Sequence, residues 1–230
     1  MLERYGFLIQ RWFRPNEPAC AMCSMGGVGS TALARHIGSI SDKTTREHAY
    51  SPVMYDQINN LRLGYMFGSP YNSVLSIFRR HYQAMHAKAM NANSPTRPVK
   101  LRGVTLEEYL EGGVDYFRME RQFDNWVGNS DPRHPTILIK YEDLGTHIGE
   151  VLDFFGCNKD FSVKARRSSW QEQPLHIRRG LEHIYGSLHE KVQAMPGLRV
   201  LTPLASRTSM PAEAGSFSWS NENAMMERSE

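Results

Sequence analysis

Short apolar runs alternate along the chain with stretches whose apolar residues recur at helical spacing. The runs at 19–23, 63–67 and 136–141 have the length and composition of buried strands, and 198–201 is a further candidate strand. Periodic or capped stretches predict helices over 31–37, 70–85, 105–126 with a break at 112–113, 144–155 and 175–195. Alternating strands and helices predict an α/β layer fold.

Local signals mark the ends of several of these helices. Ser69 is the expected N-cap of a helix whose first residue is Pro70, a residue suited to that position. Thr105 is the expected N-cap of the next helix, with Glu108 at the capping-box position. Gly156 is expected to end the helix over 144–155.

Size and charge narrow the class of protein. The 230 residues fit one domain, predicted over 1–204, and the composition of 205–230 predicts a flexible C-terminal tail. With 27 Lys and Arg against 24 Asp and Glu, the net charge of +3 is too small to indicate nucleic-acid binding. The chain has no apolar run of about eighteen residues and no secretory pattern at its start, so we predict no membrane segment. No oligomeric state can be inferred from the sequence.

The cysteines indicate a reducing compartment. The chain has three, Cys20, Cys23 and Cys157, an odd number without a disulfide framework, which predicts reduced thiols and a cytoplasmic location. Cys20 and Cys23 lie within the first predicted strand, where we expect buried apolar positions. No second pair of ligands for zinc lies near them in the sequence.

A glycine-rich stretch is the most informative feature of the chain. Residues 24–31, Ser-Met-Gly-Gly-Val-Gly-Ser-Thr, connect the first predicted strand to the first predicted helix. In such a turn, backbone N–H groups can converge on a phosphate or sulfate, and the helix N-terminus favours the negative charge. The alternative is a tight turn that binds no ligand.

This turn differs from the loop of nucleoside-triphosphate-binding proteins. That loop has the pattern G-x-x-x-x-G-K-[ST], whose lysine contacts the outer phosphates. Aligned on Gly29, the lysine position holds Ser30 and the first glycine position holds Ser24. A divergent P-loop kinase is therefore disfavoured.

Three segments, in this order, resemble those of the sulfotransferases that use 3′-phosphoadenosine 5′-phosphosulfate (PAPS). Residues 24–33 stand in the place of that family's 5′-phosphosulfate loop. Residues 67–80 are similar to its 3′-phosphate motif, with Pro70 and Ser76 matching. Residues 137–144 and 154–156 are similar to its late strand, its Tyr-Glu-Asp-Leu turn and the end of the next helix. The resemblance implies a three-layer P-loop-type fold, with a central parallel β-sheet flanked by helices, and PAPS as co-substrate without a metal.

Two positions depart from the family's pattern. The family's loop usually carries Lys or Arg where this chain has Gly27, and its 3′-phosphate motif starts with an Arg where the spacing reaches Gly68. A charge-assisted contact contributes roughly 1.5–3 kcal/mol, so the loss of two would weaken donor binding strongly. Either other cations replace them, or the usual donor is no longer bound.

The resemblance assigns candidate roles to particular residues. His48, in a polar loop predicted over 41–48, is the candidate base for the acceptor hydroxyl, with Lys43 or Arg46 as replacement cation; a solvated surface histidine is the alternative. Ser76, with Arg79 or Arg80, would hold the 3′-phosphate, although both arginines could simply be solvated. The basic segment 166–170 is another source of cations. The 5′-phosphosulfate would be held by backbone amides and hydroxyls of Gly26, Gly27, Val28, Gly29, Ser30 and Thr31.

Two functions from different classes follow. The first is an enzyme that moves a sulfuryl group from PAPS to a hydroxyl or amine of a carbohydrate or small metabolite. The second is a non-catalytic protein of the same fold that binds a nucleotide or anion. The acceptor is not encoded in a readable motif, because such pockets are built from variable loops, here 85–102 and the region after 156.

Overall fold

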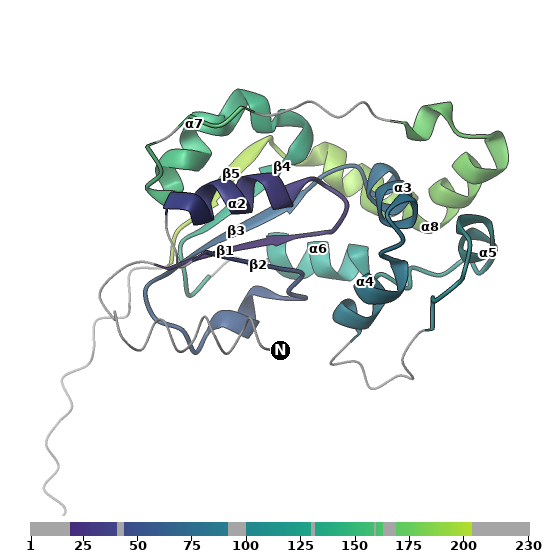
Figure 1. Ribbon diagram of the computed structural model, residues 1–230, viewed down its shortest axis with the longest axis horizontal. Coiled ribbons are helices and arrows are strands. Elements are labelled where there is room, and N and C mark those ends of the chain that lie inside the picture. Colours follow the sequence, from purple (N-terminus) through teal and green to yellow (C-terminus); the bar gives the residue numbers. More distant parts are fainter. Residues whose placement is uncertain are drawn as a thin grey trace, which may run out of the picture.

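The computed structural model describes residues 19–40, 44–91, 100–129, 132–158, 160–162 and 169–203. Five strands form one sheet in the order β2-β1-β3-β4-β5, and helices flank both of its faces (Figure 1). β1–β3 and β3–β4 pair in parallel, as do β1 and β2, whereas β5 runs antiparallel to β4. The strands are β1 (Ala19–Ser24), β2 (Thr44–Glu47), β3 (Leu61–Phe67), β4 (Thr136–Lys140) and β5 (Leu198–Leu201).

The α/β class with helices on both faces is confirmed, but two details of the sheet were predicted wrongly. The expected loop over 41–48 contains β2, which pairs with β1 from Cys20↔Thr44 to Cys23↔Glu47. β2 is an edge strand with one neighbour, and its polar sequence, Thr-Thr-Arg-Glu, lacks the apolar run that identifies buried strands. The sheet is also not purely parallel, because β5 joins the other edge in the antiparallel direction.

The helices divide between the two faces. On one face lie α2 (Ser30–Ile40) and α7 (Leu144–Phe155), seen above the sheet in Figure 1. The other helices belong to the opposite face or to one end of the sheet: α3 (Pro70–Arg79), α4 (Gln83–Met90), α5 (Leu106–Glu111), α6 (Met119–Val127) and α8 (Leu175–Ala194). Short 3-10 turns occur at Pro52–Tyr55, Tyr141–Asp143 and Trp170–Glu172.

Two apolar cores result from the alternation of side chains along the strands. In β1, Ala21 and Cys23 face the core under α3, α6 and α8, whereas Cys20 and Met22 face the core under α2 and α7. The expectation that both cysteines are buried positions of the first strand is confirmed, at 2% and 0% exposure. No helix in the described ranges is both long and apolar enough to cross a membrane.

The expected helix ends are largely confirmed. Ser69 caps α3 by accepting a hydrogen bond from Asn72 N at 3.4 Å, and Pro70 is the first residue of that helix. Thr105 and Glu108 form a complete capping box at the start of α5. Gly156 ends α7 in the left-handed conformation, with φ +70°.

One helix prediction fails. The single helix expected over 70–85 is interrupted after Arg79, and α4 begins at Gln83 in a new direction (Figure 1). His81 sits between the two helices with φ +56°. Two of the residues that suggested continuity, Tyr82 and Met85, are 45% and 61% exposed, so their spacing does not reflect a buried face. The tail predicted over 205–230 lies outside the described residues.

Candidate functional site

The glycine-rich turn lies where the chain changes direction across the sheet. It follows β1 at its carboxyl end and leads into α2, after which β2 pairs on one side of β1 and β3 on the other. In open α/β sheets, ligands bind outside the carboxyl ends of the strands at such a switch point. The topology therefore puts the turn at the expected position of a binding site.

The backbone of the turn has the conformation that glycine permits. Gly26, Gly27 and Gly29 have φ of +93°, +70° and +77°. Among the described residues, no protein acceptor is found for the backbone N–H groups of Gly26, Gly27, Val28 and Gly29. Four neighbouring donors in such a turn can converge on an anion.

Unlike the four amides of the turn, its Ser30 hydroxyl has a hydrogen-bond partner within the protein. Ser30 is buried, and its hydroxyl donates to Ser24 Oγ at 2.9 Å, a bond that links the two ends of the turn. Thr31 is half-buried in the first turn of α2. Of the two predicted hydroxyl donors, Ser30 is thus engaged within the protein.

Three neighbours pack closely against the glycines. A Cβ at position 26 would lie 2.5 Å from the His86 ring, and one at position 27 would lie 2.5 Å from the carbonyl oxygen of Ser73. A Cβ at position 29 would lie 3.2 Å from the Tyr141 ring. The turn is therefore bordered by α4, α3 and the segment that follows β4.

His48 lies beside the turn, and its tautomer follows from its contact. Its Nδ1 is 3.1 Å from the backbone oxygen of Ser24, which can only accept, so Nδ1 carries the proton. In the neutral ring, Nε2 then has the lone pair, as a general base requires. The ring also meets His86 edge-to-face, with centroids 4.9 Å apart.

His86 was not singled out from the sequence. Its side chain is 5% exposed, and Nε2 has no hydrogen-bond partner among the described residues. Burial lowers the pKa of the His86 imidazole well below its usual value, and the charges of His48 and Arg80 lower it further. No motif includes His86, and only its contact with the turn reveals it.

The three residues predicted for the 3′-phosphate have different surroundings. Ser76 is buried in α3, and its hydroxyl, like that of Ser73, has no partner among the described residues. Arg80 donates from Nε to the backbone oxygen of Ser76 at 3.1 Å, and its guanidinium lies 5.7 Å from the centre of the Tyr82 ring. Arg79 is exposed at the end of α3.

Packing restricts the two positions of the missing family cations to different degrees. At position 27 a side chain would meet the α3 backbone at Ser73. At position 68 a Cβ would lie 3.0 Å from a carboxylate oxygen of Glu142, which accepts a hydrogen bond from Ser69 N at 2.8 Å. A side chain at position 27 would have to displace the α3 backbone, whereas at position 68 it would meet the end of the Glu142 side chain, which can move.

Several other candidate cations are only partly placed. Lys43 lies outside the described residues, as do Arg166 and Arg167. Arg46 belongs to β2, but its side chain is not among those described. The end of the basic segment is nevertheless anchored beside α3, because Asn72 Oδ1 accepts from Ser169 N and Trp170 N at 3.3 and 3.2 Å.

Helix α6 holds the segment that carries His48. Gln122, which is fully buried, donates from Nε2 to the backbone oxygens of Ser24 and Ala49 at 3.3 and 2.8 Å. Trp126 Nε1 also donates to Ala49 O, at 3.1 Å. The glycine-rich turn and the His48 segment therefore share one buried amide as a support.

The described residues contain no group of three or more His, Cys, Asp or Glu side chains arranged to hold a metal.

Comparison with known proteins identifies no relative: no family model matches the chain, and no curated protein or solved structure matches it at a significant level.

Proposed function

We propose that this chain is a sulfotransferase that moves the sulfuryl group of PAPS to a hydroxyl or amine of a carbohydrate or small metabolite. In this proposal the fold is of the P-loop type, with the glycine-rich turn as the 5′-phosphosulfate loop. The observation that carries the proposal is the set of four N–H groups at the β1–β3 switch point for which the described residues offer no acceptor.

The chemistry assigns one task to each neighbour of the turn. The acceptor oxygen or nitrogen attacks sulfur, the bond from sulfur to the bridging oxygen breaks, and adenosine 3′,5′-bisphosphate leaves with the electron pair. His48 Nε2 takes the proton of the acceptor. The amides stabilise the charge on the transferred group and the leaving phosphate, as in phosphoryl transfer. Ser76 and Arg80 hold the 3′-phosphate.

A second function, binding without transfer, is favoured by the two crowded glycines. Positions 27 and 68 are the places where the resemblance expects cations, and an added Cβ would lie 2.5 Å from Ser73 O at the first and 3.0 Å from Glu142 at the second. A site with fewer cations stabilises developing negative charge less, although its amides can still bind an anion.

Calorimetry with adenosine 3′,5′-bisphosphate tests the proposal. We expect binding without metal, weakened about tenfold or more in Ser76→Ala and Arg80→Ala, since each removes a hydrogen bond to phosphate. Arg35→Ala is the matched control, because Arg35 is an exposed arginine of α2. Absence of bisphosphate binding, or binding of ATP only with Mg²⁺, would refute the proposal.

Transfer of labelled sulfate from PAPS to a panel of hydroxyl and amine acceptors then separates the two functions. Labelled product supports the enzyme. Tight bisphosphate binding with no transfer to any acceptor or to water supports the non-catalytic protein.

A further inference from the structure

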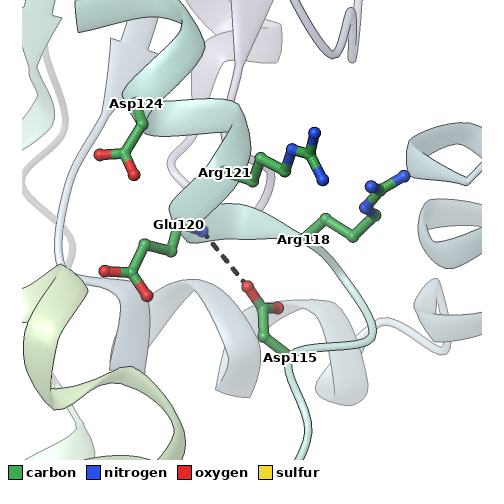
Figure 2. Close-up of a pocket in the computed structure, with 5 residues that line it drawn as sticks. All are labelled: Asp115, Arg118, Glu120, Arg121 and Asp124. Carbon is green, nitrogen blue, oxygen red and sulfur yellow. Dashed lines mark hydrogen bonds between the residues drawn. The ribbon is translucent and has the colours of Figure 1, made fainter. Parts of the chain in front are cut away.

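A pocket of about 430 Å³ lies along the first turns of α6. It is lined by charged side chains of both signs: Asp115, Arg118, Glu120, Arg121 and Asp124 (Figure 2). What the pocket can bind depends on which of these charged groups are not already bonded within the protein.

The three carboxylates are already satisfied by the protein. Asp115 accepts from the Tyr185 hydroxyl at 3.0 Å and from Glu120 N at 3.2 Å, the second bond being drawn in Figure 2. Lys191 lies 3.0 Å from Glu120 and binds both carboxylate oxygens of Asp124, at 2.8 and 2.9 Å. A cation entering the pocket would have to compete with these bonds.

The two arginines are in the opposite situation. Within the described part of the chain, the guanidinium groups of Arg118 and Arg121 make no hydrogen bond or ion pair; that of Arg118 instead lies over the Tyr50 ring, 4.8 Å from its centre. The two residues are three positions apart and so share one side of the helix. Figure 2 shows their guanidinium groups on one side and the carboxylates of Glu120 and Asp124 on the other.

The backbone holds Arg118 in an unfavourable conformation. It is the N-cap of α6 with φ +52° and ψ 34°, the left-handed region, which is unfavourable for residues other than glycine. Its N–H donates to Asp115 O at 3.0 Å, so the turn before the helix is closed. Strained residues of this kind occur preferentially at binding sites.

One arginine of the pocket contacts the segment that carries the candidate base. Tyr50, beneath the Arg118 guanidinium, is two residues after His48, and its backbone oxygen accepts from Asn125 Nδ2 on α6 at 3.2 Å. These contacts join the segment that carries His48 to the part of α6 that begins at Arg118.

We propose that Arg118 and Arg121 form the acceptor subsite of the protein and bind an anionic group, a carboxylate or a sulfate ester, on an acidic sugar. This inference rests on the proposed sulfotransferase function. Guanidinium groups suit these planar or tetrahedral oxyanions because they donate two parallel hydrogen bonds. The positive charges of the two guanidinium groups would also disfavour cationic molecules.

Calorimetry without donor tests the subsite with matched sugars. The probes are p-nitrophenyl glucuronide, p-nitrophenyl glucoside 6-sulfate and the neutral p-nitrophenyl glucoside, which distinguish carboxylate from sulfate ester. We expect at least one anionic probe to bind about tenfold or more tighter than the neutral one. Arg118→Asn and Arg121→Ala should each remove most of this preference, and Arg35→Ala should leave it intact.

Asn is chosen at position 118 because it tolerates the left-handed conformation while removing the guanidinium group. Urea unfolding of each variant confirms that it is folded. Equal binding of all three sugars, or an equal loss of preference in Arg35→Ala, would overturn the subsite.

Adenosine 3′,5′-bisphosphate binding, measured on the same proteins, separates this inference from the proposed function. If the bisphosphate fails to bind but the arginine-dependent preference for an anionic sugar remains, the donor assignment fails and the anion subsite stands. If the bisphosphate binds and the preference is absent, the reverse holds.

Discussion

At position 27, close packing against α3 explains why the chain has glycine there. The sequence shows only that a cation of the family's pattern is missing. The structure shows that a side chain would meet the Ser73 carbonyl oxygen, in a backbone conformation with φ +70°. Both the space and the conformation therefore require glycine at this point of the turn.

Gly27→Ala should lower the free energy of unfolding by about 2 kcal/mol or more, because the left-handed conformation and the close contact both penalise a Cβ. Gly149→Ala is the control: it lies in α7 with nothing within 4 Å of an added Cβ. Alanine there should raise stability by about 0.5–1 kcal/mol. Urea denaturation measures both, and a neutral Gly27→Ala would show that α3 and the turn adjust freely.

His48→Ala should abolish sulfuryl transfer, since a base commonly contributes about 10²–10⁴-fold to such a rate. Bisphosphate binding should remain within about twofold, because His48 Nδ1 lies against Ser24 O and the four amides of the turn do not depend on its ring. Single-turnover transfer and calorimetry give the two quantities. Unchanged turnover would remove His48 from the mechanism.

At the scale of elements, α6 is the support of the site. Gln122 and Trp126 together provide donors for the backbone oxygens of Ser24 and Ala49, which belong to the glycine-rich turn and the His48 segment. The sequence predicted a helix ending at Trp126, but nothing in it indicates that the helix holds these two segments together.

Gln122→Leu should cost about 1–3 kcal/mol of unfolding free energy, because two buried carbonyls each lose one of their donors while the volume stays similar. It should also weaken bisphosphate binding, since the turn loses one of its supports. Gln57→Leu, at an exposed position, is the control and should change stability by less than about 0.5 kcal/mol. Wild-type stability in Gln122→Leu would mean that the amide bonds contribute nothing net.

Some elements could be predicted from local sequence patterns, and others could not. β1, β3, β4 and the caps at Ser69 and Thr105 were predicted from apolar runs and capping residues, which are local signals. β2 was missed because an edge strand can be held by hydrogen bonds to one neighbouring strand and does not need an apolar run of its own. The break between α3 and α4 was missed because two exposed residues continued the helical spacing by chance.

At the scale of the whole molecule, the buried His86 links stability to pH. Burial, with the charges of His48 and Arg80, lowers the pKa of His86, so the unfolded chain binds a proton more readily than the folded one. The stability that depends on neutral His86 is fully present above pH of about 6.5, the unfolded pKa. It is lost as pH falls below that value.

Urea unfolding between pH 8 and pH 5 should therefore show stability falling below about pH 6.5, by up to about 1.4 kcal/mol per pH unit from this group. His86→Gln should flatten that slope, whereas His176→Gln, at an exposed position of α8, should not. If stability falls with pH equally steeply in the wild type and in His86→Gln, His86 does not control the loss of stability at low pH.

The sequence by itself determined the α/β class, the order of most elements and the glycine-rich turn after β1, because burial, capping and glycine conformation act over a few residues. Tertiary structure alone decided which side chains surround the turn. His86 and Ser73 reach it from α4 and α3, and Gln122 bonds Ser24 across 98 positions of the chain. The same packing requires glycine at position 27, where the resemblance expects a cation, and brings Arg118 over Tyr50. Such contacts depend on how distant elements pack, and no local pattern encodes that arrangement.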